Sequence, residues 1–156
     1  MTIKNISIFD LDGTVIDSSH RQATKPDGTL DLQHWFKNAT PEKIAEDKVL
    51  PLATQIRRRS KAGDFTIICT ARTLGFADFE FLAEHGLCVD KIISRPAGNM
   101  EADGKLKAKQ LASLFNLRQF QIANKVMFDD APSVRSSLRK LGIAVICPTK
   151  IQERVS

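Results

Sequence analysis

Residues 6–14 read Ile6-Ser7-Ile8-Phe9-Asp10-Leu11-Asp12-Gly13-Thr14, an apolar run that ends in two carboxylates one residue apart. Residues i and i+2 of a β-strand point the same way, so Asp10 and Asp12 leave the carboxyl end of one strand close together. Two such anions repel each other unless a cation lies between them or one holds a proton. The pair is costly in a core and useful in catalysis, because one carboxylate can be a nucleophile beside a hard metal and the other a proton donor. Gly13 lets the backbone turn after them.

This segment resembles the first motif of the haloacid dehalogenase (HAD) superfamily of phosphotransferases. The alternative, a calcium-binding EF-hand loop, needs a carboxylate or amide at its fifth position and glycine at its sixth. Counted from Asp10, the chain has Thr14 and Val15 there, which excludes that loop. The resemblance implies a Mg²⁺-dependent phosphatase. Asp10 would form an aspartyl-phosphate, and Asp12 would protonate the leaving oxygen and then deprotonate water.

The rest of the chain alternates strand-like apolar runs with stretches of helical periodicity. The expected strands are Ile3–Phe9, Phe65–Thr70, Val89–Ile93, Lys125–Phe128 and Ile143–Cys147. The expected helices cover residues 49–62, 76–83, 106–115 and 133–141. This order predicts an α/β fold, a parallel sheet with helices on both faces. With the resemblance, we expect one HAD-type, Rossmann-like domain over residues 1–156.

Residues 15–48 interrupt this alternation as a polar insert after the first strand. The insert holds the turn signal Pro26-Asp27-Gly28 and one weakly amphipathic piece around Leu30 to Ala39. A long irregular segment in a compact domain is usually functional or mobile. Many HAD enzymes place a cap here, but about thirty residues are too few for a full cap domain, so we expect an open site.

Polar residues also follow the second expected strand, where Phe65–Cys69 stops at Thr70-Ala71-Arg72. Ligands of open α/β sheets bind at the carboxyl ends of the strands. The resemblance to the second HAD motif implies that the Thr70 hydroxyl and the neighbouring Ala71 amide bind the transferring phosphoryl group. Arg72 is a candidate for a bidentate phosphate contact.

The fourth expected strand stops at Asp129-Asp130, which matches the HAD motif that completes a Mg²⁺ site. Aspartate also favours helix N-caps, and Pro132 suits a first helical turn, so each of the pair can have either role. We favour Asp129 as the direct ligand and Asp130 as a ligand or its partner. The implied metal set is Asp10, Asp12 through its backbone carbonyl, Asp129 and Asp130.

The motif lysine that neutralises the nucleophile and phosphoryl has three candidates: Lys105, Lys107 and Lys109. Asp103-Gly104-Lys105-Leu106-Lys107 resembles the segment before this helix in phage-type phosphatases and favours Lys107.

A narrower likeness is to the 3′-phosphatase domain of bacteriophage polynucleotide kinases. The segments that carry it are Asp17-Ser18-Ser19-His20-Arg21, Trp35-Phe36, Thr70-Ala71-Arg72, Ile93-Ser94-Arg95-Pro96 and Asp129-Asp130. The chain departs from that group in having no P-loop, and Ala131 stands where an arginine often follows. His20 and Arg21 are candidates to contact a nucleotide. Trp35 and Phe36 either stack on a base or form local core.

We therefore expect removal of 3′-phosphates from nucleic-acid ends, with a 5′- or 3′-nucleotidase on free (deoxy)nucleotides as the alternative. A third possibility is a catalytically silent nucleotide-binding or regulatory protein. The net charge of +5 suits a polyanionic substrate, and Arg57-Arg58-Arg59 would bind its backbone if that helix adjoins the cleft. Oligomeric state is not readable from the sequence.

Cysteine usage and the N-terminus predict a cytoplasmic protein. Cys69 and Cys147 lie in apolar runs, which is typical of buried thiols in a reducing compartment. We find neither a signal peptide nor an apolar stretch that could cross a membrane.

Overall fold

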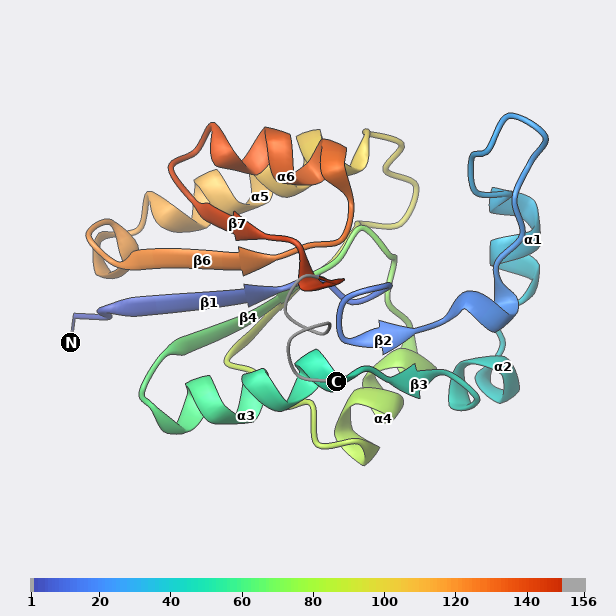
Figure 1. Ribbon diagram of the computed structural model, residues 1–156, viewed down its shortest axis with the longest axis horizontal. Coiled ribbons are helices and arrows are strands. Elements are labelled where there is room, and N and C mark those ends of the chain that lie inside the picture. Colours follow the sequence, from blue (N-terminus) through green and yellow to red (C-terminus); the bar gives the residue numbers. More distant parts are fainter. Residues whose placement is uncertain (1, 150–156) are drawn as a thin grey trace.

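The computed structural model describes residues 2–149, and its centre is a five-stranded parallel sheet of order β5-β4-β1-β6-β7 (Figure 1). Every neighbouring pair in this sheet is parallel. The expected strands are all present, although most are shorter at one or both ends. They are β1 (Asn5–Phe9), β4 (Phe65–Cys69), β5 (Lys91–Ile93), β6 (Asn124–Phe128) and β7 (Ala144–Ile146).

Helices cover both faces of the sheet, which confirms the predicted fold class (Figure 1). The main helices are α3 (Thr54–Lys61) and α4 (Phe76–Glu84) on one face, α5 (Asp103–Phe115) and α6 (Pro132–Arg139) on the other. Two short 3₁₀ helices, η2 (Pro51–Ala53) and η3 (Arg118–Phe120), precede α3 and β6.

Alternation along β1 divides the core into two layers. Ile6 and Ile8 pack with Leu111 of α5, whereas Phe9 packs with Ile56 of α3 and Phe81 of α4. These β1 side chains are fully buried because both faces of a parallel sheet are covered by helices. The central strand is thereby held rigidly, and its carboxyl end is a fixed platform for the residues that follow.

The insert over residues 15–48 is rooted in a short antiparallel pair, β2 (Ile16–Asp17) and β3 (Lys48–Val49). The 3₁₀ helix η1 (Ser19–Arg21) follows β2, and α1 (Leu32–Lys37) lies inside the expected amphipathic piece. A second helix, α2 (Pro41–Ala45), was not expected. The Thr40 side chain caps it, and Pro41 occupies its first turn.

The insert stands at the carboxyl end of the sheet (Figure 1). Ile44 of α2 joins the core layer of Phe81 and Leu82, which ties the insert to α4. The expected helix over residues 49–62 was wrong in its first turn. Val49 ends β3, and Leu50 is extended because Pro51 disfavours a helical residue before it.

Strand order places the candidate site. From β1 the chain crosses to β4 and β5 on one side, and then returns to β6 and β7 on the other. Ligands bind at such a switch point, in the crevice outside the carboxyl ends of the strands. Among the described residues, no helix is long and apolar enough to pass through a bilayer.

Candidate active site

Asp10 follows β1 and is held by two cationic or polar partners. Lys107 Nζ of α5 donates to Asp10 Oδ1 at 2.8 Å and to Asp129 Oδ2 at 2.7 Å, and the lysine is only 2% exposed. Thr14 Oγ1 donates to Asp10 Oδ2 at 3.2 Å. Of the three candidate lysines, the structure brings only Lys107 to the carboxylates, because its neighbours two residues away point to the exposed side of the helix.

Carboxylates from two strand ends form a cluster that could hold a cation. Oxygens of Asp10, Asp129 and Asp130 all lie within 4.8 Å of one another. Hard divalent cations such as Mg²⁺ take oxygen ligands of this kind, so the donor set fits the predicted cofactor. The three carboxylates and the Lys107 ammonium leave two net negative charges, which a divalent ion balances.

Gly13 lets the two strand ends approach each other. Its φ of +79° lies in the left-handed region, and a Cβ atom there would stand 2.8 Å from Asp130 Cγ. A side chain is therefore excluded by both backbone conformation and space. The sequence indicated only the conformational reason, the turn after the strand.

Burial shifts the protonation of this cluster. Burial and the Asp129 charge raise the pKa of Asp10 well above its usual range, although Lys107 opposes them. Burial alone would lower the pKa of Lys107, but attraction to Asp10 and Asp129 outweighs it and raises that pKa. Burial also raises the pKa of Asp130. The ammonium stays charged, and the carboxylates need further positive charge to ionise together.

Asp12 points away from the carboxylate cluster. Arg72 forms a bidentate ion pair with Asp12: Nε donates to Asp12 Oδ2 at 3.1 Å, and Nη2 donates to Asp12 Oδ1. Ser18 Oγ donates to the same Oδ1 at 2.6 Å. The Asp12 side chain is thus separate from the metal set, and only its backbone carbonyl remains a predicted ligand.

The sequence suggested Arg72 as a phosphate contact, but in the structure its guanidinium binds carboxylates. Besides Asp12, its Nη1 donates to Asp78 Oδ1 of α4 at 2.7 Å, and its Nη2 lies 3.8 Å from Asp47 Oδ2. The guanidinium is committed to carboxylates because three of them converge on it. It lines the cleft while orienting Asp12, a contact that its place in the motif did not reveal.

Thr70 and Ala71 lie where the sequence placed them, at the end of β4. Thr70 is 1% exposed, its N–H donates to Ile93 O, and its Oγ1 accepts from the Arg72 N–H at 3.0 Å. Both residues line the same cleft as Asp10 and Lys107. The ends of β1, β4 and β6 and the helix α5 therefore contribute to one site.

The sequence suggested that Arg21 contacts a nucleotide, but in the structure Arg21 does not line the cleft. Its Nε and Nη2 each donate to Asp47 at 2.9 Å, and it is 1% exposed. Its guanidinium lies 4.3 Å from the Trp35 ring centroid, and Arg72 lies 5.4 Å from the same ring. His20 Nε2 also contacts Asp47, at 2.7 Å. Both basic residues from the resemblance thus bind Asp47 and anchor the insert.

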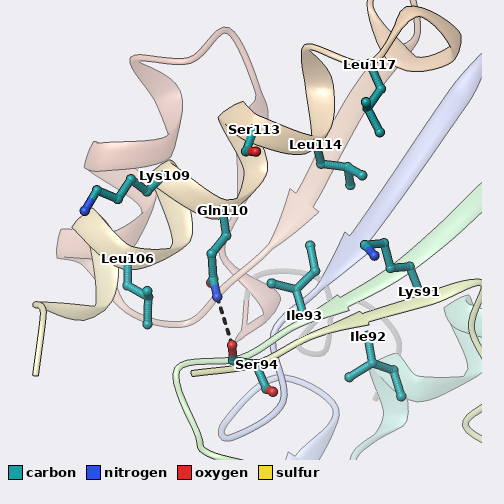
Figure 2. A pocket seen from close by; sticks show the side chains of 10 residues that line it. All are labelled: Lys91, Ile92, Ile93, Ser94, Leu106, Lys109, Gln110, Ser113, Leu114 and Leu117. Atoms are coloured by element: carbon teal, nitrogen blue, oxygen red, sulfur yellow. Dashed lines mark hydrogen bonds between the residues drawn. The ribbon is translucent and has the colours of Figure 1, made fainter. Parts of the chain in front are cut away.

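The site opens into a cleft of about 520 Å³ between the strand ends and the insert. The catalytic candidates Asp10, Asp12, Thr70 and Lys107 line its base. A second hollow, of about 750 Å³, lies between β5 and α5 (Figure 2). None of the described residues that line it is acidic, and its visible hydrogen bond joins Gln110 to Ser94 O. The candidate catalytic residues therefore all lie in the smaller cleft.

The basic run of α3 does not adjoin that cleft. Arg57, Arg58 and Arg59 are absent from its lining, and α3 runs back along the sheet away from the strand ends (Figure 1). Arg59 Nη1 donates to Ser7 Oγ at 3.1 Å, and the guanidinium lies 5.1 Å from the Phe128 ring. The run is a surface and packing feature on that face.

With this geometry in view, comparison with known proteins identifies the family. The family model described as "Bacteriophage T5 5′-deoxynucleotidase" matches residues 1–156. The chain belongs to this 5′-deoxynucleotidase family. The 5′-deoxynucleotidase of Escherichia phage T5 is 39% identical over 89 residues, which are 54% of this chain and 36% of that protein. The aligned part is thus well under half of the phage T5 protein.

Solved structures show that the family has the HAD fold. A chain from the "Pnkp1/Rnl/Hen1 RNA repair complex" matches with a TM-score of 0.66 and 20% identity, over 93% of this chain and 42% of that one. A haloacid dehalogenase-like hydrolase of Streptococcus pneumoniae matches with a TM-score of 0.62 and 14% identity, over 92% and 84%. The predicted HAD-type fold is confirmed, and the family to which the chain belongs is named for a phosphoric monoester hydrolase, as predicted.

Sequence reasoning missed four residues that organise the site of this 5′-deoxynucleotidase family member: Thr14, Ser18, Asp47 and Asp78. Thr14 and Ser18 stood within quoted motifs, but only their hydroxyl contacts reveal what they hold. Asp78 sits in the first turn of α4 and also accepts from the Gly75 N–H. No local signal marks Asp47, because its partners are 26 and 27 residues away.

Proposed function

We propose that the protein is a Mg²⁺-dependent phosphomonoesterase that hydrolyses deoxynucleoside 5′-monophosphates through an aspartyl-phosphate. The observation that carries this proposal is Lys107, which is buried between Asp10 and Asp129 at the end of the central strand. Family membership over residues 1–156 supports the substrate class.

Two displacements complete the reaction. An Asp10 carboxylate oxygen bonds to phosphorus as the ester P–O bond breaks, and Asp12 gives its proton to the leaving nucleoside oxygen. Asp12 then takes a proton from water, whose oxygen bonds to phosphorus as the Asp10–phosphorus bond breaks. Phosphate leaves and Asp10 is regenerated. Both Asp12 oxygens accept from Arg72 in the structure, so Asp12 has to release at least one of these hydrogen bonds and take up a proton before it can protonate the leaving oxygen.

Charge stabilisation comes from the groups around Asp10. The Thr70 hydroxyl, the Ala71 amide and the Lys107 ammonium are positioned to hold the equatorial phosphoryl oxygens. Asp10, Asp129 and Asp130 would hold Mg²⁺, with the Asp12 carbonyl as a further ligand. When bound, the ion supplies positive charge to the nucleophile and the phosphoryl group.

The first substrate expected from the sequence, a 3′-phosphorylated nucleic-acid end, becomes the alternative. That expectation drew on the resemblance, the small insert and the net positive charge, but the basic run Arg57 to Arg59 does not line the cleft. The relative that matches is named for a 5′-deoxynucleotidase activity. A catalytically silent binding protein is not favoured, because every acidic and basic group of the proposed reaction is present in the cleft.

A phosphate-release panel tests the proposal. The substrates are the four deoxynucleoside 5′-monophosphates, the matching 3′-monophosphates and a 3′-phosphorylated oligonucleotide, each with Mg²⁺ and with excess EDTA. We expect Mg²⁺-dependent release that is fastest from the 5′-monophosphates and absent in Asp10→Asn. Faster release from the oligonucleotide would reverse the order of the two substrates, and full activity in EDTA would remove the metal.

A further inference from the structure

We infer that the mouth of the cleft is a nucleobase-binding subsite formed by Leu30, Leu32 and Phe36 of the insert and Met100 of the loop opposite. We call these four residues the apolar rim. The inference rests on the proposed function, since it supplies the part of the nucleotide that the phosphoryl site does not hold.

The first observation is where exposed apolar side chains gather. Ten large hydrophobic residues are exposed among those described, and the four of the apolar rim line this single cleft. Phe36 is 67% exposed and Met100 is 86% exposed. Scattered exposed hydrophobics are normal, but a group that surrounds a concave polar site marks a binding surface.

The insert side of the apolar rim is rigidly supported. Trp35, next to Phe36 on α1, is 9% exposed and lies against the guanidinium groups of Arg21 and Arg72. Arg21 in turn is paired with the buried Asp47. The two aromatic residues have therefore separated into different roles. Both line the cleft, but Trp35 is nearly buried, whereas Phe36 is largely exposed and free to stack.

The opposite side is equally well fixed, by Arg95. Its Nη1 donates to Asn99 O and to Glu101 O, on either side of Met100, at 3.2 and 2.8 Å. Its Nε donates to Ala71 O at 2.8 Å, which ties the loop to the proposed phosphoryl site. The backbone on both sides of Met100 is thus fixed relative to Ala71. A thioether adapts well to ring faces and edges.

The ligand that would fit is indicated by the different chemistry at the base and the mouth of the cleft. The base of the cleft suits a phosphate monoester, and its mouth suits a flat apolar group joined to that phosphate. A nucleobase meets both requirements, because every base has a π-face for an aromatic ring. Stacking on the apolar rim does not distinguish base edges, so the rim by itself should accept all four bases, the larger purines more tightly. Selectivity between bases would come from polar side chains that also line the cleft, such as Gln22 and Asn99.

The test compares deoxyadenosine 5′-monophosphate with deoxyribose 5-phosphate, which has the same ester and no base. Wild type, Phe36→Ala, Phe36→Trp and Met100→Ala are assayed for kcat/KM on both. The control is Phe76→Ala, which removes an even more exposed phenylalanine, on α4, that does not line the cleft. Stacking on one aromatic side chain predicts that Phe36→Ala lowers the nucleotide-to-sugar ratio of kcat/KM about tenfold, mostly through KM.

Phe36→Trp should keep the ratio within about twofold of wild type, Met100→Ala should lower it less than Phe36→Ala, and Phe76→Ala should leave it unchanged. If Phe36→Ala slows both substrates equally, Phe36 only supports the site and the subsite is disproved. A wild-type ratio near one would disprove it as well. Should neither substrate be hydrolysed, the proposed function fails separately. Calorimetric binding of both compounds to Asp10→Asn, with and without Phe36→Ala, then decides the subsite by the same ratio.

Discussion

Gly13 has two functions in its motif: it adopts a positive φ, and its missing side chain leaves room for Asp130. Gly13→Ala forces a side chain into the left-handed region, at a cost of roughly 1–2 kcal/mol, and pushes Asp130 out of the carboxylate cluster. We expect kcat to fall at least tenfold. Gly63→Ala is the matched control, because Gly63 has a φ of +95° with nothing within 4 Å of its Cβ position. Urea unfolding should show a similar loss for both variants, and phosphate release a loss only at Gly13. Equal activity losses in the two variants would show that the space at Gly13 is not specifically needed by the site.

Asp10 gives a pH-dependent prediction. Its pKa is raised by burial, so the folded state favours its neutral form and loses stability as pH rises above the ordinary carboxyl range near 4. Asparagine cannot ionise. In EDTA, Asp10→Asn should therefore match wild-type Tm near pH 4 and exceed it increasingly toward pH 8, with Mg²⁺ narrowing the gap. Thermal scans at several pH values measure this. A variant less stable than wild type at pH 8 in EDTA would show that the Lys107 attraction outweighs burial.

Single residues were predictable from sequence where a local pattern carries their chemistry. Asp10, Thr70 and Asp129 follow apolar strands, and the structure places each at a strand end. Their catalytic roles stay predictions. Arg21 was misassigned because its partner Asp47 is 26 residues away, at the far end of the insert. Pairings of that range depend on how the insert folds back, which no nearby residue specifies.

At the scale of elements, the insert depends on one buried ion pair. Arg21 and Asp47 are almost fully buried, and breaking such a pair leaves an uncompensated charge in the core. Asp47→Ala should cost about 3–5 kcal/mol of unfolding free energy, whereas Arg21→Met with Asp47→Leu should recover most of it. Urea unfolding of the three proteins checks the order. If the double variant is as unstable as the single one, the pair is required for a reason other than its buried charge.

The insert also shows which elements the sequence could indicate. The Leu30 to Ala39 piece predicted α1 because its periodicity is visible, but α2 is only five residues long and depends on Ile44 reaching the core of α4. Two-residue strands such as β2 and β3 are too short for any alternating pattern. Their pairing is tertiary in origin, so it could not be predicted locally.

At the scale of the whole molecule, parallel topology does most to create the site. Residues 10, 70 and 129 are far apart in sequence and meet because the parallel strands that precede them end at the same edge of the sheet, and Lys107 reaches that edge from α5. The alternation of strands and helices predicts that meeting, since it requires a parallel sheet. Net charge predicts far less. The same +5 suits a nucleic-acid partner or none, and the arrangement of charges on the surface has to decide.

That arrangement leads to a prediction about salt. A mononucleotide releases few counterions on binding, so kcat/KM for deoxynucleoside 5′-monophosphates should fall less than about tenfold for a tenfold rise in salt. Arg57→Gln with Arg58→Gln removes two exposed charges of α3, and this variant should reproduce the wild-type salt response because neither residue lines the cleft. A nucleic-acid end bound along a basic surface would instead add roughly 0.7 to the logarithmic slope for each phosphate contacted. A steep slope with a 3′-phosphorylated oligonucleotide, flattened by the double substitution, would mean that α3 does guide a polyanion. The alternative substrate would then be the better explanation of the basic charge.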